Sequence, residues 1–131
     1  TGATQWVMAM PDVFSIRHTS VEDYVEPIAH EVKVSRADLL SDLRKPAKGL
    51  AYAALASQCW YVVREGIARP EDVPDGFGLI ESRAAGLEVL RPAPSRPMRL
   101  PFAVWMTLAR ATAEAVALDE AQRSLGEEPQ P

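Results

Sequence analysis

Hydrophobic and polar residues alternate over several short stretches of this chain, a pattern that predicts β-strands. Turn-forming residues separate most of the stretches, and Pro11 predicts a bend between the first two. One stretch, at 59–63, is continuously apolar, which favours an interior strand. The predicted strands are QWVMAM (5–10), DVFSIRH (12–18), IAHEVKV (28–34), CWYVV (59–63), FGLIES (77–82) and GLEVLRP (86–92).

A helix is predicted directly after the third strand. Ser35 precedes RADLLSDLRK, and Asp38 follows three residues later, which makes Ser35 a suitable N-cap. Pro46 lacks a backbone donor, so it should kink or restart the helix. The apolar stripe of the first half consists of Leu39, Leu40 and Leu43, and that of the second half of Leu50, Ala54 and Leu55.

A last amphipathic helix is predicted from Pro101 onward, since proline is favoured in the first helical turn. Its apolar residues recur at three-to-four spacing. A tryptophan on such a stripe indicates core packing or an interface far more often than a cofactor site. The stripe consists of Phe102, Trp105, Ala109, Ala113 and Val116.

The order of predicted elements is three strands, a helix, three strands and a helix. This order predicts an α/β fold with a mixed β-sheet flanked by α-helices. We expect one domain over residues 1–118, including the C-terminal helix, and an acidic, flexible tail over 119–131.

Composition and charge narrow the class of protein. The chain has 131 residues, 47% of them hydrophobic and 24% charged, as in a globular domain. The net charge of −4 argues against a protein that coats duplex DNA nonspecifically. The tail carries four acidic residues and one basic residue, Arg123. The rest of the chain is therefore close to neutral, and its charge does not exclude a local basic face.

The single cysteine, Cys59, excludes an internal disulfide and any multi-cysteine zinc site. Its apolar surroundings favour a buried structural thiol over a nucleophile. We expect a reducing, cytoplasmic location. No segment has the roughly 18 unbroken apolar residues of a transmembrane helix.

The candidate chemistry lies in HEVKVSRADLL, residues 30–40. Alternate residues of a strand face the same side, so Glu31 and Lys33 share a face while Val32 points to the other. A solvated ion pair is the simplest interpretation of that spacing alone. Asp12 begins the preceding strand, and a hairpin would place it opposite Glu31.

Two carboxylates brought together on a sheet repel each other, and a cation resolves that repulsion. Oxygen ligands without a His or Cys cluster select Mg²⁺ or Mn²⁺. Asp12, Glu31 and the Val32 carbonyl could hold such an ion on a scissile phosphate. Lys33 could then orient the attacking water or neutralise the transition state. The alternative to a metal ligand at this position is that Asp12 is an ordinary turn residue.

MPDVFSI followed by HEVKVSRADLL resembles the PD-(D/E)XK nuclease superfamily, and most closely its MmcB-like DNA repair family. The resemblance covers roughly residues 9–94 and extends to the CWYVV and FGLIES strands. It implies a restriction-endonuclease-like α/β core and a Mg²⁺- or Mn²⁺-dependent nuclease acting on DNA in repair or recombination. Asp12 and Glu31 would be the ligands and Lys33 the catalytic lysine.

Further residues could contact nucleic acid. KGLAY, with Lys48 and Tyr52, resembles the Gln-x-x-x-Tyr helix of RecB-type nucleases, with Lys in place of Gln. An ordinary solvated face is the alternative for the basic residues, and core packing is the alternative for Tyr52. The candidate DNA-binding residues are Arg36, Arg44, Lys45, Lys48 and Tyr52.

Two other functions stay open. The same fold could bind nucleic acid or a protein with its chemistry weak or lost, which the negative charge favours. The Trp105 helix could also dock a second copy of the chain or a protein partner.

Overall fold

The computed structural model describes residues 11–111 of the chain. The chain divides into two compact units, Thr1–Leu100 and Pro101–Pro131, and each is described by itself. The predicted strand at 5–10, the tail at 119–131 and the last helix beyond residue 111 lie outside the described residues.

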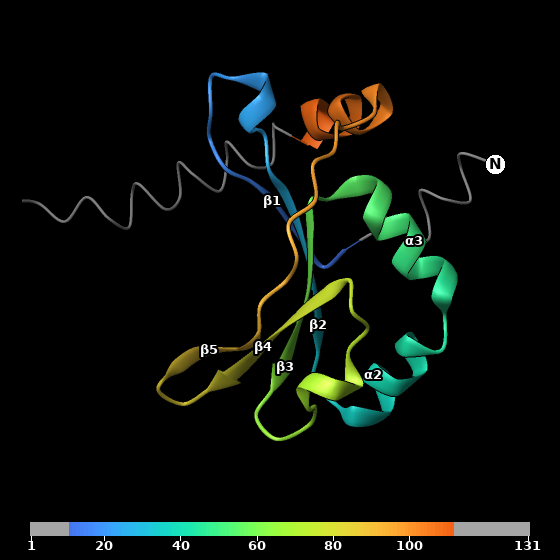
Figure 1. Ribbon diagram of the computed structural model, residues 1–131, viewed down its shortest axis with the longest axis vertical. Coiled ribbons are helices and arrows are strands. Elements are labelled where there is room, and N and C mark those ends of the chain that lie inside the picture. Colours follow the sequence, from blue (N-terminus) through green and yellow to red (C-terminus); the bar gives the residue numbers. More distant parts are fainter. Residues whose placement is uncertain (1–10, 112–131) are drawn as a thin grey trace, which may run out of the picture. The chain divides into compact units, whose positions relative to one another are not determined.

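The first unit is built on a five-stranded mixed sheet with the strand order β1-β2-β3-β4-β5 (Figure 1). The two outer pairs, β1–β2 and β4–β5, are antiparallel, whereas β2, β3 and β4 run parallel. The predicted α/β class with a mixed sheet is confirmed. The strands are β1 (Val13–Ile16), β2 (Pro27–Lys33), β3 (Gln58–Arg64), β4 (Phe77–Arg83) and β5 (Gly86–Arg91).

The predicted hairpin between the second and third sequence strands is present as β1 and β2. Val13 pairs with His30 and Ile16 with Pro27. The polar loop between the strands contains a 3-10 turn, η1 (Glu22–Tyr24), which the sequence pattern did not predict. A second 3-10 turn, η2 (Pro70–Asp72), occupies the loop before β4.

Two helices connect β2 to its parallel neighbour β3. In α2 (Arg36–Leu43), the Ser35 hydroxyl accepts a hydrogen bond from the Asp38 N–H at 3.2 Å, so the predicted N-cap is confirmed. A separate helix, α3 (Pro46–Leu55), then begins with Pro46 in its first turn. Proline therefore restarts the helix.

The predicted apolar side of α3 is largely wrong. Leu50 is 76% exposed and Ala54 is also exposed, whereas Leu55 is buried as expected. Tyr52, at only 1% exposed, faces inward together with Leu55. The large aromatic ring packs against Phe77 of β4, with 6.4 Å between the ring centroids, and this contact decides which face of the helix is inward.

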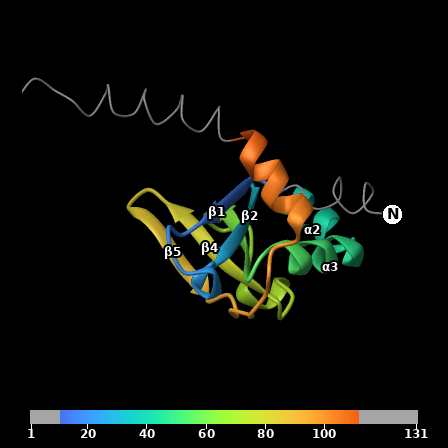
Figure 2. The same ribbon diagram turned by 90° about the horizontal axis from the view of Figure 1, so that it is seen from above.

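Both helices cover the same face of the sheet (Figures 1 and 2). Strand residues on this face alternate with exposed or half-buried ones, as expected for a pleated sheet. The apolar core lies between this face and the helices. Its buried members include Ala29, Leu39, Tyr52, Leu55, Cys59, Tyr61, Val63, Phe77 and Leu79.

The opposite face contains a close approach between β3 and β4. Trp60 pairs in register with Gly78. A Cβ atom on Gly78 would lie 2.6 Å from the Ala93 nitrogen and would overlap the Trp60 ring, so only glycine fits beside that ring.

The described part of the second unit is a helix over residues 102–111. Its first turn starts at Pro101, whose carbonyl accepts the Val104 N–H at 3.0 Å, as the sequence predicts. Ala113 and Val116 of the predicted stripe lie outside the described residues. Within residues 11–111, no helix is long and apolar enough to cross a membrane.

Candidate functional site

Glu31 and Lys33 lie on the helix-covered face near the end of β2, as the strand alternation predicts. Glu31 is 5% exposed and pairs in register with Tyr61 of β3. Val32, on the opposite face, is 43% exposed. Glu31 is therefore a buried carboxylate and not one half of a solvated surface pair.

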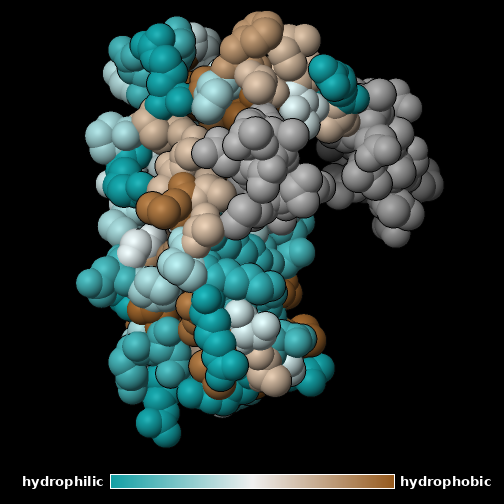
Figure 3. All heavy atoms as spheres, turned by 90° about the vertical axis from the view of Figure 1, so that its right-hand side faces the viewer, coloured by the Kyte–Doolittle hydropathy of each residue, from teal (hydrophilic) through white to brown (hydrophobic). Residues whose placement is uncertain are grey.

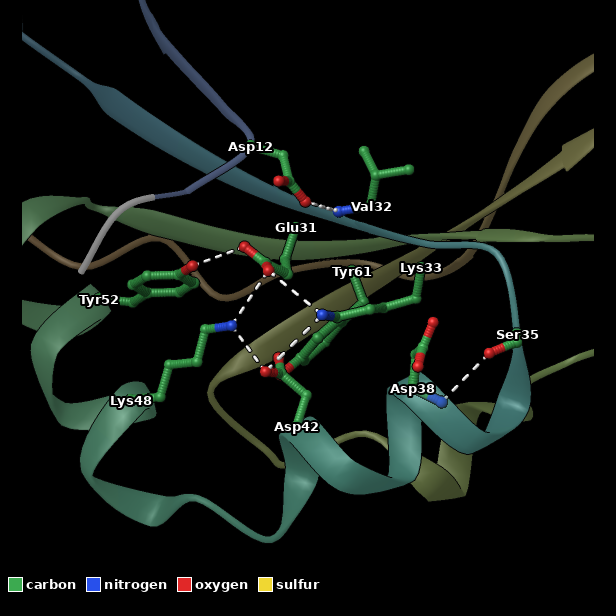
Figure 4. Close-up of polar contacts among 10 residues, drawn as sticks. All are labelled: Asp12, Glu31, Val32, Lys33, Ser35, Asp38, Asp42, Lys48, Tyr52 and Tyr61. Carbon is green, nitrogen blue, oxygen red and sulfur yellow. Dashed lines mark hydrogen bonds and ion pairs between the residues drawn. The ribbon is translucent and has the colours of Figure 1, made fainter. Parts of the chain in front are cut away.

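Asp12 lies beside the same strand. It directly precedes the Val13–His30 pair of the antiparallel ladder, which puts it opposite Glu31. Its Oδ2 accepts the backbone N–H of Val32 at 2.8 Å (Figure 4). This bond ties the start of β1 to the segment that carries Glu31 and Lys33, as the predicted hairpin requires.

Helix α3 contributes two side chains that lie one turn apart. Lys48 Nζ donates to Glu31 Oε1 at 3.0 Å, and the Tyr52 hydroxyl donates to Glu31 Oε2 at 2.5 Å. Residues four apart share a helix face, so both reach the same carboxylate. The Lys-x-x-x-Tyr spacing thus brings both residues to Glu31.

Asp42 of α2 is a member of this site that the sequence analysis missed. It is 6% exposed and lies 2.6 Å from Lys48 Nζ through Oδ1. Its Oδ2 accepts the Tyr61 hydroxyl at 2.9 Å. A signal was present, because Asp42 falls between Leu39 and Leu43 on the apolar stripe of α2.

Together these side chains form what we call the β2 cluster (Figure 4). Lys33 Nζ completes it, 3.4 Å from Glu31 Oε1 and 3.7 Å from Asp42 Oδ1. Two carboxylates thus face two ammonium groups, and two tyrosine hydroxyls satisfy the remaining carboxylate oxygens. The β2 cluster consists of Glu31, Lys33, Asp42, Lys48, Tyr52 and Tyr61.

The charges of the cluster shift its pKa values. Burial tends to raise the pKa of Asp42, but the hydrogen bonds from Lys48 and Tyr61 and the nearby ammonium charges outweigh it and lower that pKa. Burial tends to lower the pKa of Lys48, but its bonds to Asp42 and Glu31 raise it. Both groups are therefore held in their charged forms.

The two tyrosines are held neutral. Burial, followed by the hydrogen bond to Glu31, raises the pKa of Tyr52, and the charges of Asp42 and Asp12 act in the same direction. Burial and the charge of Asp42 raise the pKa of Tyr61. Both hydroxyls therefore act as hydrogen-bond donors to carboxylates.

The candidate DNA-binding residues separate into different environments. Lys48 and Tyr52 belong to the β2 cluster. Arg36 binds the Ile67 carbonyl and the Asp72 carboxylate, which ties α2 to η2. Arg44 and Lys45 are exposed between the two helices. Hydrophilic residues predominate over the lower half of the helix-covered side (Figure 3).

The donor chemistry of the site fits a hard divalent cation. Asp12 and Glu31 supply carboxylate oxygens at adjoining positions, the donor type that Mg²⁺ and Mn²⁺ prefer. The Lys48 ammonium group lies between the carboxylates of Glu31 and Asp42, which shows that these two carboxylates already hold a positive charge. Within residues 11–111, no three or more His, Cys, Asp or Glu side chains are grouped to hold a metal ion.

Cys59 does not belong to this chemistry. The thiol is buried, and burial raises its pKa, although Arg96 opposes the shift. It is the buried structural thiol that the sequence predicts.

No protein-family model matches the chain, and no curated protein matches it. Among solved structures, the chain is similar to SPO1766, a protein of unknown function from Silicibacter pomeroyi. The two are 27% identical with a TM-score of 0.52, and the alignment covers 81% of this chain and 69% of SPO1766. This similarity supports the fold and carries no information about function.

Proposed function

We propose that the chain is a Mg²⁺- or Mn²⁺-dependent nuclease of the PD-(D/E)XK type that hydrolyses DNA phosphodiester bonds in repair or recombination. The observation that carries the proposal is the position of Asp12 beside β2, opposite Glu31, with Lys33 on the same face as Glu31. The β1–β2 hairpin joins these residues, and two helices and the parallel strand β3 follow it.

Each residue has a role in this mechanism. A divalent cation, when bound, would neutralise the scissile phosphate and lower the pKa of the attacking water. Asp12, Glu31 and the Val32 carbonyl would hold it. Lys33 orients the water and stabilises charge that develops on the phosphate. The Tyr52 hydroxyl fixes Glu31 Oε2 through its hydrogen bond. The Asp42 carboxylate keeps the Lys33 ammonium group on the helix-covered face of the sheet.

The surroundings of the site fit this substrate. Arg44 and Lys45 are exposed next to the cluster and could bind the phosphate backbone. Cys59 is a free thiol, in line with a reducing cytoplasm, where such an enzyme would meet DNA.

A second candidate function is a nuclease-fold module that binds nucleic acid or a protein without cutting. The charge balance of the β2 cluster favours it: Lys33 and Lys48 already compensate Glu31 and Asp42. A cluster that is neutral without a metal needs none for its stability.

Cleavage assays separate the two functions. The parent protein is incubated with single-stranded, duplex and branched DNA in Mn²⁺ or Mg²⁺. The nuclease should cut at least one substrate, and Asp12→Asn and Lys33→Met should each lose about 100-fold or more of the rate. The matched controls Asp38→Asn and Arg17→Met change exposed residues outside the site and should keep the parent rate.

Absence of cleavage by the parent protein, or equal rates for all four variants, would rule out the nuclease. Binding of the protein to DNA that stays intact, measured by fluorescence anisotropy, would then support the binding module.

A further inference from the structure

The Lys48 ammonium group lies between two buried carboxylates. Its Nζ atom lies 3.0 Å from Glu31 Oε1 and 2.6 Å from Asp42 Oδ1. Both carboxylates are buried, and the Lys48 side chain is 19% exposed. The ammonium group therefore bridges two carboxylates that would otherwise repel each other.

The backbone around Lys48 delivers this side chain to the cluster. Pro46 ends the continuity of α2 and starts α3, so Lys48 lies in the first turn of a new helix. Tyr52 follows one turn later and is anchored by its packing against Phe77 and its bond to Glu31. The position of Lys48 thus follows from the fold.

A metal ion held by Glu31 would compete with the Lys48 ammonium group for Oε1, because Oε2 is engaged by Tyr52. Glu31 Oε2 receives the Tyr52 hydroxyl, and Oε1 receives Lys48. A Mg²⁺ ion binds carboxylate oxygens at about 2.1 Å. An ammonium group left at its present distance from Oε1 would then be a close neighbour of a divalent cation, and like charges at such range repel strongly.

We infer that Lys48 is an internal cation that competes with the divalent cation for Glu31, so that metal binding requires the ammonium group to leave Oε1. The inference rests on the proposed metal-dependent function and deepens it. Lys48 therefore lowers the affinity of the site for the divalent cation. The protein pairs its carboxylates without metal and exchanges one cation for another when metal binds.

The test is the affinity for Mn²⁺ alone, measured by isothermal titration calorimetry on the full chain. Lys48→Met should lower the dissociation constant about tenfold or more, because it removes the competing charge. Lys48→Arg keeps the charge and should stay close to the parent. Arg17→Met, which removes an exposed charge outside the β2 cluster, should also leave the affinity unchanged.

The outcomes distinguish the inference from the proposed function. Equal Mn²⁺ affinity for Lys48→Met and the parent overturns the inference and leaves the metal-dependent function standing. Binding by Lys48→Met but not by the parent supports the inference and overturns that function. Binding by neither overturns both.

A measurement on the unaltered protein covers the case in which Lys48→Met does not fold. The Lys48 side-chain ammonium signal, assigned by its loss in Lys48→Arg, is followed by NMR during a Mg²⁺ titration. The inference expects this signal to shift or broaden as the ammonium group leaves Glu31. An unchanged signal in a protein that binds the metal contradicts it.

Discussion

Two parallel strands of the sheet carry the same spacing of a carboxylate and a cation. Glu31 and Lys33 lie near the end of β2, and Glu81 and Arg83 lie at the end of β4, each pair separated by one residue. Both glutamates are 5% exposed on the helix-covered face. Their surroundings nevertheless differ in kind.

Glu81 is compensated locally. Arg83 Nε lies 2.5 Å from its Oε1, and the Gly66 N–H donates to its Oε2 at 3.3 Å. Arg83 also contacts Glu88 of the adjacent strand β5, whose side chain is half exposed. All of these partners come from the same hairpin or from the neighbouring loop.

Glu31 receives partners from distant parts of the chain. Lys48 and Tyr52 reach it from α3, and Asp42 of α2 shares both lysines with it. A carboxylate and a cation two positions apart therefore form an ion pair on both β2 and β4. The elements packed over β2 turn one of the two pairs into a candidate site.

The largest expected effect is on cleavage. Glu31→Gln should reduce the rate of DNA cleavage about 100-fold or more, because it removes a charged oxygen ligand while the amide can still accept from Tyr52. Glu81→Gln, the same change at the matching position of β4, should leave the rate unchanged. Equal losses in both variants would show that the two pairs do not differ in function.

The next effect is on stability. Asp42→Ala removes a buried carboxylate and leaves Lys48 and the Tyr61 hydroxyl short of a partner, so it should lower the free energy of unfolding by about 2–3 kcal/mol. Asp38→Ala, on the exposed side of the same helix, is the control and should cost far less. Urea denaturation measures the free energy of unfolding of both variants. Similar losses would contradict the stabilising role of the Asp42 contacts with Lys48 and Tyr61.

The β2 cluster should also make stability fall at alkaline pH. The pKa of Tyr61 is raised above its ordinary value of 10.0, so its contribution is complete below pH 10 and is lost as pH rises beyond that. Tyr61→Phe should flatten this decline by up to about 1.4 kcal/mol per pH unit.

Urea denaturation between pH 8 and pH 11 tests this expectation. Tyr24→Phe is the control, because Tyr24 is 71% exposed and should keep the decline of the parent. A decline that Tyr61→Phe leaves unaltered would mean that Tyr61 does not cause it.

The smallest effect is expected at the contact between Arg83 of the β4 pair and Glu88 of β5. Glu88→Gln removes the contact with Arg83, which is 40% exposed, and screened pairs of this kind contribute little. The melting temperature should change by about 2 °C or less. A larger loss would mean that the β4 pair is a connected network like the β2 cluster.

Much of the fold could be predicted from local sequence signals. Short apolar stretches predicted β1 to β5, Ser35 predicted the start of α2, and Pro46 predicted the break before α3. Each of these signals acts through a few neighbouring residues. The inward face of α3 was predicted wrongly at Leu50 because Tyr52, through its contacts with Glu31 and Phe77, sets that face.

The sequence by itself determined which residues share a strand face, because the side-chain period of a strand is two. It therefore put Glu31 and Lys33 on one side, and the short hairpin put Asp12 opposite Glu31. Only the tertiary structure decided that Asp42, Lys48 and both tyrosines surround this pair. Those contacts join segments of the chain between 6 and 30 residues apart, and no local period encodes how two helices pack over a strand.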